Sequence, residues 1–182
     1  MSSFWRRYSR CAAWSFLPVG YGLGMQALIY SDKDMVSWWE KLSKPPFFVE
    51  SPAAGLVMDV GVPLSLGYGF HLVKEEAAAT LVSTHDEVSP TTLTLLPSVS
   101  FAAVLALSAV PMVVLRTTRN LKKAAYSYAL VTLGSCAMVV CFWRVSRTGG
   151  LLAIPWTLWM AYSGISLYSM WKRNQRPGYV SI

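Results

Sequence analysis

Side chains that could carry out catalysis are few in this 182-residue sequence. Its two histidines are His71, near the end of a long apolar stretch, and His85, in the most polar stretch of the chain. A lone histidine is more often a structural residue than a metal ligand, and no G-x-S-x-G nucleophile motif is present. No paired acid and base stands out either. We therefore expect no enzyme, no catalytic residue, no metal ion and no cofactor.

Asp59 is the only charged residue in an otherwise apolar stretch, residues 51–73. A carboxylate at hydrocarbon depth costs at least ~2.5–3.5 kcal/mol on insertion scales, and such residues usually face the interior of a helix bundle. One interpretation is therefore a polar contact with a ligand or an ion. The other places Asp59 near the end of its helix, where water reaches it. The residues alone do not choose between the two.

Eight tryptophans are an unusual number for a chain of this length. Most stand near the ends of apolar stretches, where tryptophans form the aromatic belts of membrane proteins. Trp159 instead falls in the middle of the last apolar stretch, residues 148–171. An indole N–H at that depth needs a hydrogen-bond partner or a cavity. We interpret Trp159 as lining an internal pocket.

The elements that must position these residues are long apolar helices. The composition is 54% hydrophobic and only 14% charged, whereas soluble domains average about 25% charged. About 20 apolar residues span a ~30 Å hydrocarbon core. Five stretches reach that length: residues 11–30, 51–73, 93–115, 124–143 and 148–171. A signal peptide is the alternative for the first, but its apolar part exceeds the usual length and no cleavage pattern follows.

Lysine and arginine in the connecting segments predict the orientation. They are more numerous in the segments after the first, third and fifth stretches than in the N-terminal arm and the other connections. Basic residues gather on the cytosolic side, so the C-terminal tail, residues 172–182, is predicted to be cytosolic. The net charge of +7 is thus a topology signal, and we expect no nucleic-acid partner.

Two connections have a character of their own. After the first stretch, Met35, Trp39 and Leu42 share one helical face, which predicts a short interfacial helix beginning near Asp34. Residues 74–92 form the longest polar segment and predict a loop on the non-cytosolic side. Small residues four apart, Gly20 with Gly24 and then Gly61, Ser65 and Gly69, predict close helix packing.

Three blocks of sequence form a recognisable pattern. Residues 37–45 read S-W-W-E-K-L-S-K-P, and residues 67–73 read G-Y-G-F-H-L-V. The third block runs from Val145-Ser146 through Pro155 and Trp159 to Trp171-Lys172. Together they resemble the W-Y-x-x-L-x-K-P, M-G-Y-x-x-x-L-V and V-S…L-x-x-P-Y-x-x-W-x-A-F…W-R segments of the translocator protein or tryptophan-rich sensory protein family, which binds tetrapyrroles and sterols.

The resemblance implies a five-helix bundle, a homodimer, and a pocket beneath the connection between the first two helices. The candidate ligand-binding residues, from this resemblance together with the two residues weighed above and one further tryptophan, are Trp38, Trp39, Lys44, Pro45, Asp59, Trp143, Trp159 and Ser163. The sequence departs from the family at several positions. The family's last-helix asparagine falls on Leu167, and its second-helix tryptophan falls near Met58 or Asp59.

The sequence therefore predicts an all-α polytopic membrane protein: a single domain, residues 1–182, of five transmembrane helices with a short interfacial helix between the first and second. Its predicted function is that of a membrane receptor or translocator that binds a hydrophobic ring ligand, a porphyrin or a sterol, and takes part in its transport. The resemblance implies the mitochondrial outer membrane. The alternative is an unrelated multi-pass transporter subunit or assembly factor without a small-molecule site.

Overall fold

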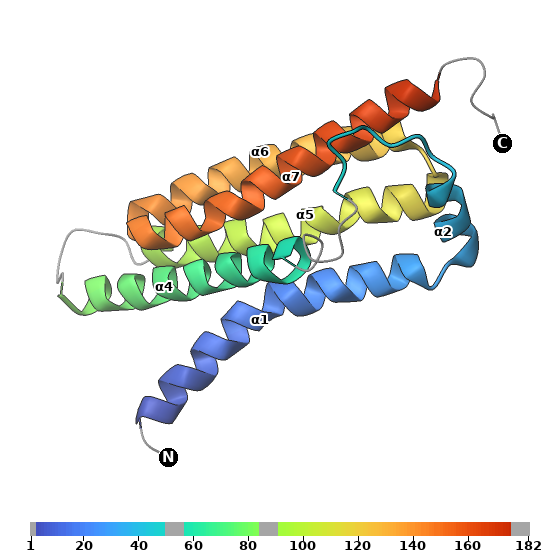
Figure 1. Cartoon of the computed structure of the whole chain (residues 1–182). Helices are drawn as coiled ribbons and strands as arrows, with labels where there is room; N and C mark the ends of the chain where they lie inside the picture. Colours follow the sequence, from blue (N-terminus) through green and yellow to red (C-terminus); the bar gives the residue numbers. More distant parts are fainter. Residues whose placement is uncertain (1–2, 50–56, 84–90, 176–182) are drawn as a thin grey trace.

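The computed structural model describes residues 3–49, 57–83 and 91–175, and every regular element in these ranges is helical. Five helices are long, and Figure 1 shows them side by side as a bundle. The elements in chain order are α1 (Ser3–Tyr30), α2 (Lys33–Glu40), η1 (Val57–Gly61), α4 (Val62–Ser83), η2 (Thr91–Leu95), α5 (Leu96–Thr118), α6 (Leu121–Val145) and α7 (Arg147–Asn174). The two η segments are short π-helical turns that lead directly into α4 and α5.

The predicted short helix after the first apolar stretch is confirmed as α2. Asp32 is its N-cap and accepts a hydrogen bond from the Met35 backbone N–H at 3.0 Å. Met35 is buried and Trp39 packs on the core from α2, while Leu42, which follows the end of the helix, packs on the core as well. The predicted apolar face therefore holds this helix against the bundle.

The predicted polar loop starts later than expected. Residues 74–83 continue α4 as a helix, because Glu75, Glu76 and the three alanines that follow have high helix propensity and outweigh the polarity of the segment. The remainder of that predicted loop falls mostly on residues 84–90, outside the described residues. Polarity identified a segment outside the apolar core, but it did not identify its conformation.

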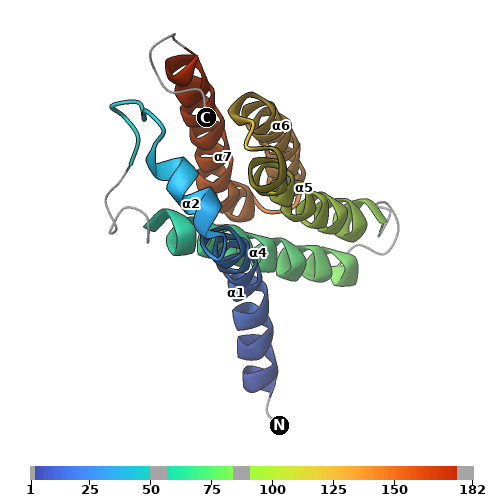
Figure 2. The same cartoon turned by 90° about the vertical axis from the view of Figure 1, so that its right-hand side faces the viewer.

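The long helices run up and down between two ends of the bundle. Figure 1 places α2, the turn between α5 and α6, and the C-terminal end of α7 at one end. The turn between α6 and α7 and the N-terminal end of α5 lie at the other. Viewed from the α2 end in Figure 2, α5, α6 and α7 form one group, and α1 and α4 lie beside it. Short connections explain the antiparallel neighbours, since Arg119-Asn120 joins α5 to α6 and Ser146 joins α6 to α7.

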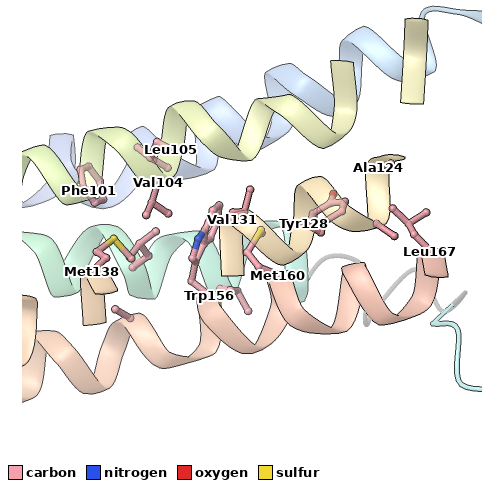
Figure 3. Close-up of a cluster of buried hydrophobic side chains, with 14 of the residues drawn as sticks. Phe101, Val104, Leu105, Ala124, Tyr128, Val131, Met138, Trp156, Met160 and Leu167 are labelled. Atoms are coloured by element: carbon pink, nitrogen blue, oxygen red, sulfur yellow. The ribbon is translucent and has the colours of Figure 1, made fainter. Parts of the chain in front are cut away.

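An aromatic cluster ties four helices together. The rings of Phe70 in α4 and Phe101 in α5 stack at 4.1 Å, and Phe142 in α6 lies 5.8 Å from Phe70. Trp14 in α1 meets Phe70 edge-on at 5.1 Å. Figure 3 follows the core from this region along α5, α6 and α7, where Trp156 and neighbouring side chains fill the space between the helices. This half of the bundle is solidly packed.

Glycines allow two close helix contacts. A methyl group at Gly67 would collide with the backbone carbonyl oxygens of Trp14 and Ser15, and one at Gly69 would lie 2.8 Å from the carbonyl oxygen of Gly149. Ser65 adds a hydrogen bond of 3.1 Å to the Leu152 carbonyl oxygen. The predicted packing face of α4 is therefore used at Ser65 and Gly69. The predicted face of Gly20 and Gly24 has open space around it.

Three helical segments of the described chain are long and apolar enough to cross a membrane: Leu93–Thr118, Leu121–Val145 and Arg147–Asn174. They correspond to three of the five predicted spans. The described part of α4 is interrupted by Lys74, Glu75 and Glu76, and the start of its predicted span lies in residues 50–56, which are not described. The apolar part of α1 is diluted by glycine and polar residues. These two predicted spans are helical where described, and their insertion stays a prediction.

Candidate functional site

A cavity of about 840 Å³ lies at the α2 end of the bundle. Its walls come from α1, η1, α5, α6 and α7, and its cover comes from α2 and from residues 41–49, which we call the strap. Most lining side chains are apolar or aromatic. A second, smaller cavity of about 250 Å³ lies between the α5–α6 turn and the end of α7.

The cover is built from aromatic side chains. Trp39 in α2 lies 6.1 Å from Phe48 in the strap, measured between ring centroids, and both line the cavity. The Lys44 ammonium lies 5.6 Å from the centre of the Phe48 ring, within range of a cation–π interaction. Pro45 turns the strap, since its carbonyl oxygen accepts a hydrogen bond from the Phe48 N–H at 2.9 Å. This turn folds the strap back over the cavity, which Phe48 lines.

Two side chains of α7 hold the strap by its backbone. The Asn174 carboxamide accepts a hydrogen bond from the Ser43 N–H at 3.0 Å and donates one to the Ser43 carbonyl oxygen at 3.1 Å. The Tyr162 hydroxyl accepts from the Val49 N–H at 2.9 Å and donates to the Phe47 carbonyl oxygen at 3.0 Å. Both ends of the strap are therefore fixed to the same helix.

One face of α7 forms a wall of the cavity. Trp159 and Tyr162 stack with their ring centroids 5.2 Å apart, and Ser163, Ser166 and Leu167 continue the same face. The Ser163 hydroxyl donates to the Trp159 carbonyl oxygen at 2.9 Å. Charged residues of both signs also line the cavity: Asp59, Glu40 and Lys44.

Five of the eight predicted ligand-binding residues line this cavity: Trp39, Lys44, Asp59, Trp159 and Ser163. The structure brings them together although η1, the strap and α7 are far apart in sequence. Asp59 lines the cavity but is only partly buried, and it lies in η1 at the beginning of its helix, so both interpretations of its position stay open.

The other three predicted residues lie outside the lining. Trp38 is partly buried beside Trp39, with a ring separation of 6.4 Å. Pro45 is buried within the strap and positions Phe48. Trp143 is 44% exposed near the far end of α6, where its backbone and ring lie against Gly150. None of these three faces the cavity.

Sequence reasoning missed several lining residues. Tyr162 and Ser166 follow Trp159 at i+3 and i+7, so the helical period could have identified them once Trp159 was assigned to the pocket. Glu40 lies one residue beyond Trp39 and was not considered. Tyr128 is a buried residue in the first third of α6, and no local pattern singles it out.

Metal chemistry finds no support in the part of the chain that the structure describes. There, no three His, Cys, Asp or Glu side chains are grouped closely enough to hold a metal ion. The three cysteines, Cys11, Cys136 and Cys141, are free thiols. The lining itself has the character of a binding cavity, with aromatic walls and a few polar groups.

Fold and site together define a class: an all-α protein with membrane-spanning helices, in which a cover between the first two long helices closes an aromatic cavity. The sequence model of the TspO/MBR family matches residues 14–172, most of the chain. The chain belongs to the TspO/MBR family and is a membrane protein of this type. No individual curated protein matches the sequence.

Proposed function

We propose that this protein binds a hydrophobic ring ligand, a porphyrin or a sterol, in the cavity beneath α2 and the strap, and takes part in its transport through the membrane. The observation that carries the proposal is the cavity itself. Its volume of about 840 Å³ falls within the range of roughly 300–1,000 Å³ typical of small-molecule sites.

The chemistry of the walls supports a flat, apolar ligand. Trp39 and Phe48 cover the space, and the stacked pair of Trp159 and Tyr162 faces it from α7. Aromatic rings bury a large apolar area and prefer offset or edge-on contact with another ring system. The few polar groups at the wall would orient the ligand, while burial of its rings would supply most of the affinity.

The proposal extends to the molecule in its membrane. All five long helices span the bilayer, the C-terminal tail is cytosolic, and the protein forms a homodimer in the mitochondrial outer membrane. Binding and passage of the ligand require no catalytic step. Family membership supports insertion in a membrane. The resemblance and the charge distribution support the five spans, the orientation, the homodimer and the mitochondrial outer membrane.

A fluorescence titration tests the binding. Protoporphyrin and the fluorescent sterol dehydroergosterol are added separately to the purified protein in dodecylmaltoside, and quenching of tryptophan emission is followed. We expect saturable quenching by at least one of them, weakened about tenfold or more in Trp159→Ala. Trp143→Ala is the matched control, because it removes one indole outside the cavity and should leave the affinity unchanged.

Two results would contradict the proposal. If neither compound gave saturable quenching, the result would favour the alternative of a transporter subunit or assembly factor without a small-molecule site. Equal loss of affinity in Trp143→Ala and Trp159→Ala would show that binding takes place elsewhere. Thermal unfolding of both variants shows whether each retains its fold.

A further inference from the structure

Three polar side chains from separate elements line the cavity. Asp59 reaches it from η1, Tyr128 from α6 and Ser166 from α7. Tyr128 is 6% exposed and Ser166 is 2% exposed, so water reaches neither freely. Tyr128 also lies within electrostatic reach of Asp59 and of Tyr21 in α1. Three separate elements therefore bring a carboxylate and two buried hydroxyl groups to one cavity.

The two buried hydroxyl groups that line the cavity lack strong hydrogen-bond partners within the described residues. Serine and threonine in these helices commonly donate to a carbonyl oxygen of their own helix, as Ser163 does to Trp159 and Ser135 to Val131. The Ser166 hydroxyl makes no such bond and has no other partner among the described residues. The Tyr128 hydroxyl has one contact, the Met112 sulfur at 3.9 Å, and a thioether is a weak acceptor.

The buried Tyr21 hydroxyl is also without a partner in the part of the chain that the structure describes. Buried polar groups are nearly always hydrogen-bonded in proteins, and those that are not usually indicate a functional role or a missing molecule. Ser166 and Tyr128 line the cavity, so a polar group on a bound ligand can satisfy them.

The charge of the lining determines which polar group fits. Three of the described lining residues carry a full charge: two acids, Asp59 and Glu40, and one base, Lys44. Glu40 is exposed at the outer cover, whereas Asp59 is partly buried at the wall near Tyr128. An ionised carboxylate accepts hydrogen bonds and donates none. A carboxylate on the ligand would therefore meet a like charge there, and an alcohol or an ammonium group would find an acceptor.

We propose that Asp59, with the hydroxyl groups of Tyr128 and Ser166, forms a polar subsite that selects ligands whose apolar ring body ends in a hydrogen-bond donor, an ammonium or an alcohol, over those that end in a carboxylate. This proposal rests on the proposed function, since it specifies the polar end of the ligand bound in the same cavity: of the two ligands named there, it favours the sterol, which ends in an alcohol, over the porphyrin, which carries carboxylates. The Asp59 carboxylate accepts a hydrogen bond from the donor group of the ligand. The hydroxyl groups of Tyr128 and Ser166 form the other hydrogen bonds to the same group.

Three probes with one ring body test the selection: 1-pyrenemethylamine, 1-pyrenemethanol and 1-pyrenecarboxylic acid. Each is titrated into the full-length protein in dodecylmaltoside at neutral pH, and energy transfer from tryptophan to pyrene reports binding. The wild type should bind the amine most tightly, the alcohol next and the carboxylate at least about tenfold more weakly than the amine. This order needs no variant, so it tests the proposal even if a substitution impairs folding.

Asp59→Asn then tests the assignment to the carboxylate. It should weaken binding of the amine about tenfold, strengthen binding of the carboxylate, and leave the alcohol within about twofold. Ser166→Ala should weaken the alcohol about threefold or more. Asp34→Asn is the matched control, because it removes an exposed carboxylate of α2 that does not line the cavity, and it should preserve the order and the affinities.

The outcomes separate this proposal from the one on which it rests. Saturable binding of all three probes with equal affinity, or tightest binding of the carboxylate, would overturn the subsite and leave the ring-binding cavity standing. An unchanged order in a folded Asp59→Asn variant would likewise overturn it. If none of the three probes bound saturably, the result would count against both proposals.

Discussion

Single aromatic residues determine what the cavity presents to a ligand. Trp38 and Trp39 are neighbours in α2, but successive residues of a helix point about 100° apart. Trp39 consequently lines the cavity next to Phe48, whereas Trp38 packs on the bundle without reaching it. The motif that contains both tryptophans is thus divided between binding and packing.

Replacing Trp39 should affect ligand affinity more than stability. Trp39→Ala removes a ring from the cover, and we expect protoporphyrin or dehydroergosterol to bind about tenfold more weakly, about 1.4 kcal/mol. Full burial of a large apolar side chain contributes about 1.5–3 kcal/mol, and Trp39 is only partly buried, so its loss should lower the free energy of unfolding by about 1 kcal/mol or less. Trp38→Ala is the control in the same titration and should retain the affinity. Aggregation of Trp39→Ala under conditions where the wild type stays dispersed would instead make the cover a structural element.

Replacement of Gly67 by a larger residue should destabilise the contact between α1 and α4. A side chain there would strike the backbone carbonyl oxygens of Trp14 and Ser15, and backbone cannot move aside as a flexible side chain can. We expect Gly67→Ala to lower the free energy of unfolding by about 1–3 kcal/mol, the usual cost of overpacking. Gly22→Ala is the matched control, because nothing lies within 4 Å of an added methyl group. It should be neutral or stabilising, since alanine favours helix by about 0.5–1 kcal/mol over glycine. Equal midpoints of thermal unfolding in the two variants would contradict this assignment.

At the scale of elements, the strap is attached to the bundle chiefly at its two ends. The Lys41 and Leu42 N–H groups donate to the Trp39 carbonyl oxygen, Pro45 makes a turn, and α7 holds the strap through Asn174 and Tyr162. Opening the cavity to a ligand requires movement of some part of its cover, and segments with few buried contacts open most readily. The two attachment points should therefore control access.

Asn174→Ala should loosen one end of the strap and leave the other in place. The Ser43 amide loses its acceptor, and the net value of one hydrogen bond, about 0.5–1.5 kcal/mol, predicts an amide hydrogen exchange rate faster by about twofold to tenfold. The Val49 amide, bonded to Tyr162, should change little. Tyr162→Phe serves as the reciprocal control and should accelerate exchange at Val49 alone. If either substitution accelerated both amides equally, the strap would move as one unit and the two attachments would not be independent.

The helical elements were largely predictable from sequence, and the attachments of the strap were not. Long apolar stretches and the face shared by Met35 and Trp39 are local patterns, and they located four of the long helices and α2 closely. The bonds from Asn174 to Ser43 join residues 131 positions apart and use backbone groups, so no residue type on the strap marks them. Trp159 was found because its depth was unusual, whereas Tyr128 occupies an ordinary helix position. Its role depends on which helices surround it.

At the scale of the whole molecule, the bundle has two chemically different ends. The α2 end holds the exposed basic residues of the α5–α6 turn and of the end of α7, and Lys122 and Lys172 lie over the rings of Trp171 and Tyr168 at 5.0 Å each. Ser43 is bonded to Asn174 at this same end. The described segments that the sequence grouped on its predicted cytosolic side are therefore together in space, as expected where successive long helices alternate in direction.

Labelling of introduced cysteines tests the orientation of these ends. In a variant whose own three cysteines are replaced by serine, Thr118→Cys places a thiol at the exposed end of α5, and Thr148→Cys places one at the start of α7 at the other end. Lysine and arginine favour the cytosolic side, so a maleimide–polyethylene glycol too large to pass a porin should modify Cys at position 118 in intact membranes and spare position 148. Both positions should react once the membrane is dissolved in detergent, which verifies that each thiol is accessible. Modification of position 148 alone in intact membranes would invert the orientation and place the ligand cavity, with its strap, toward the opposite side.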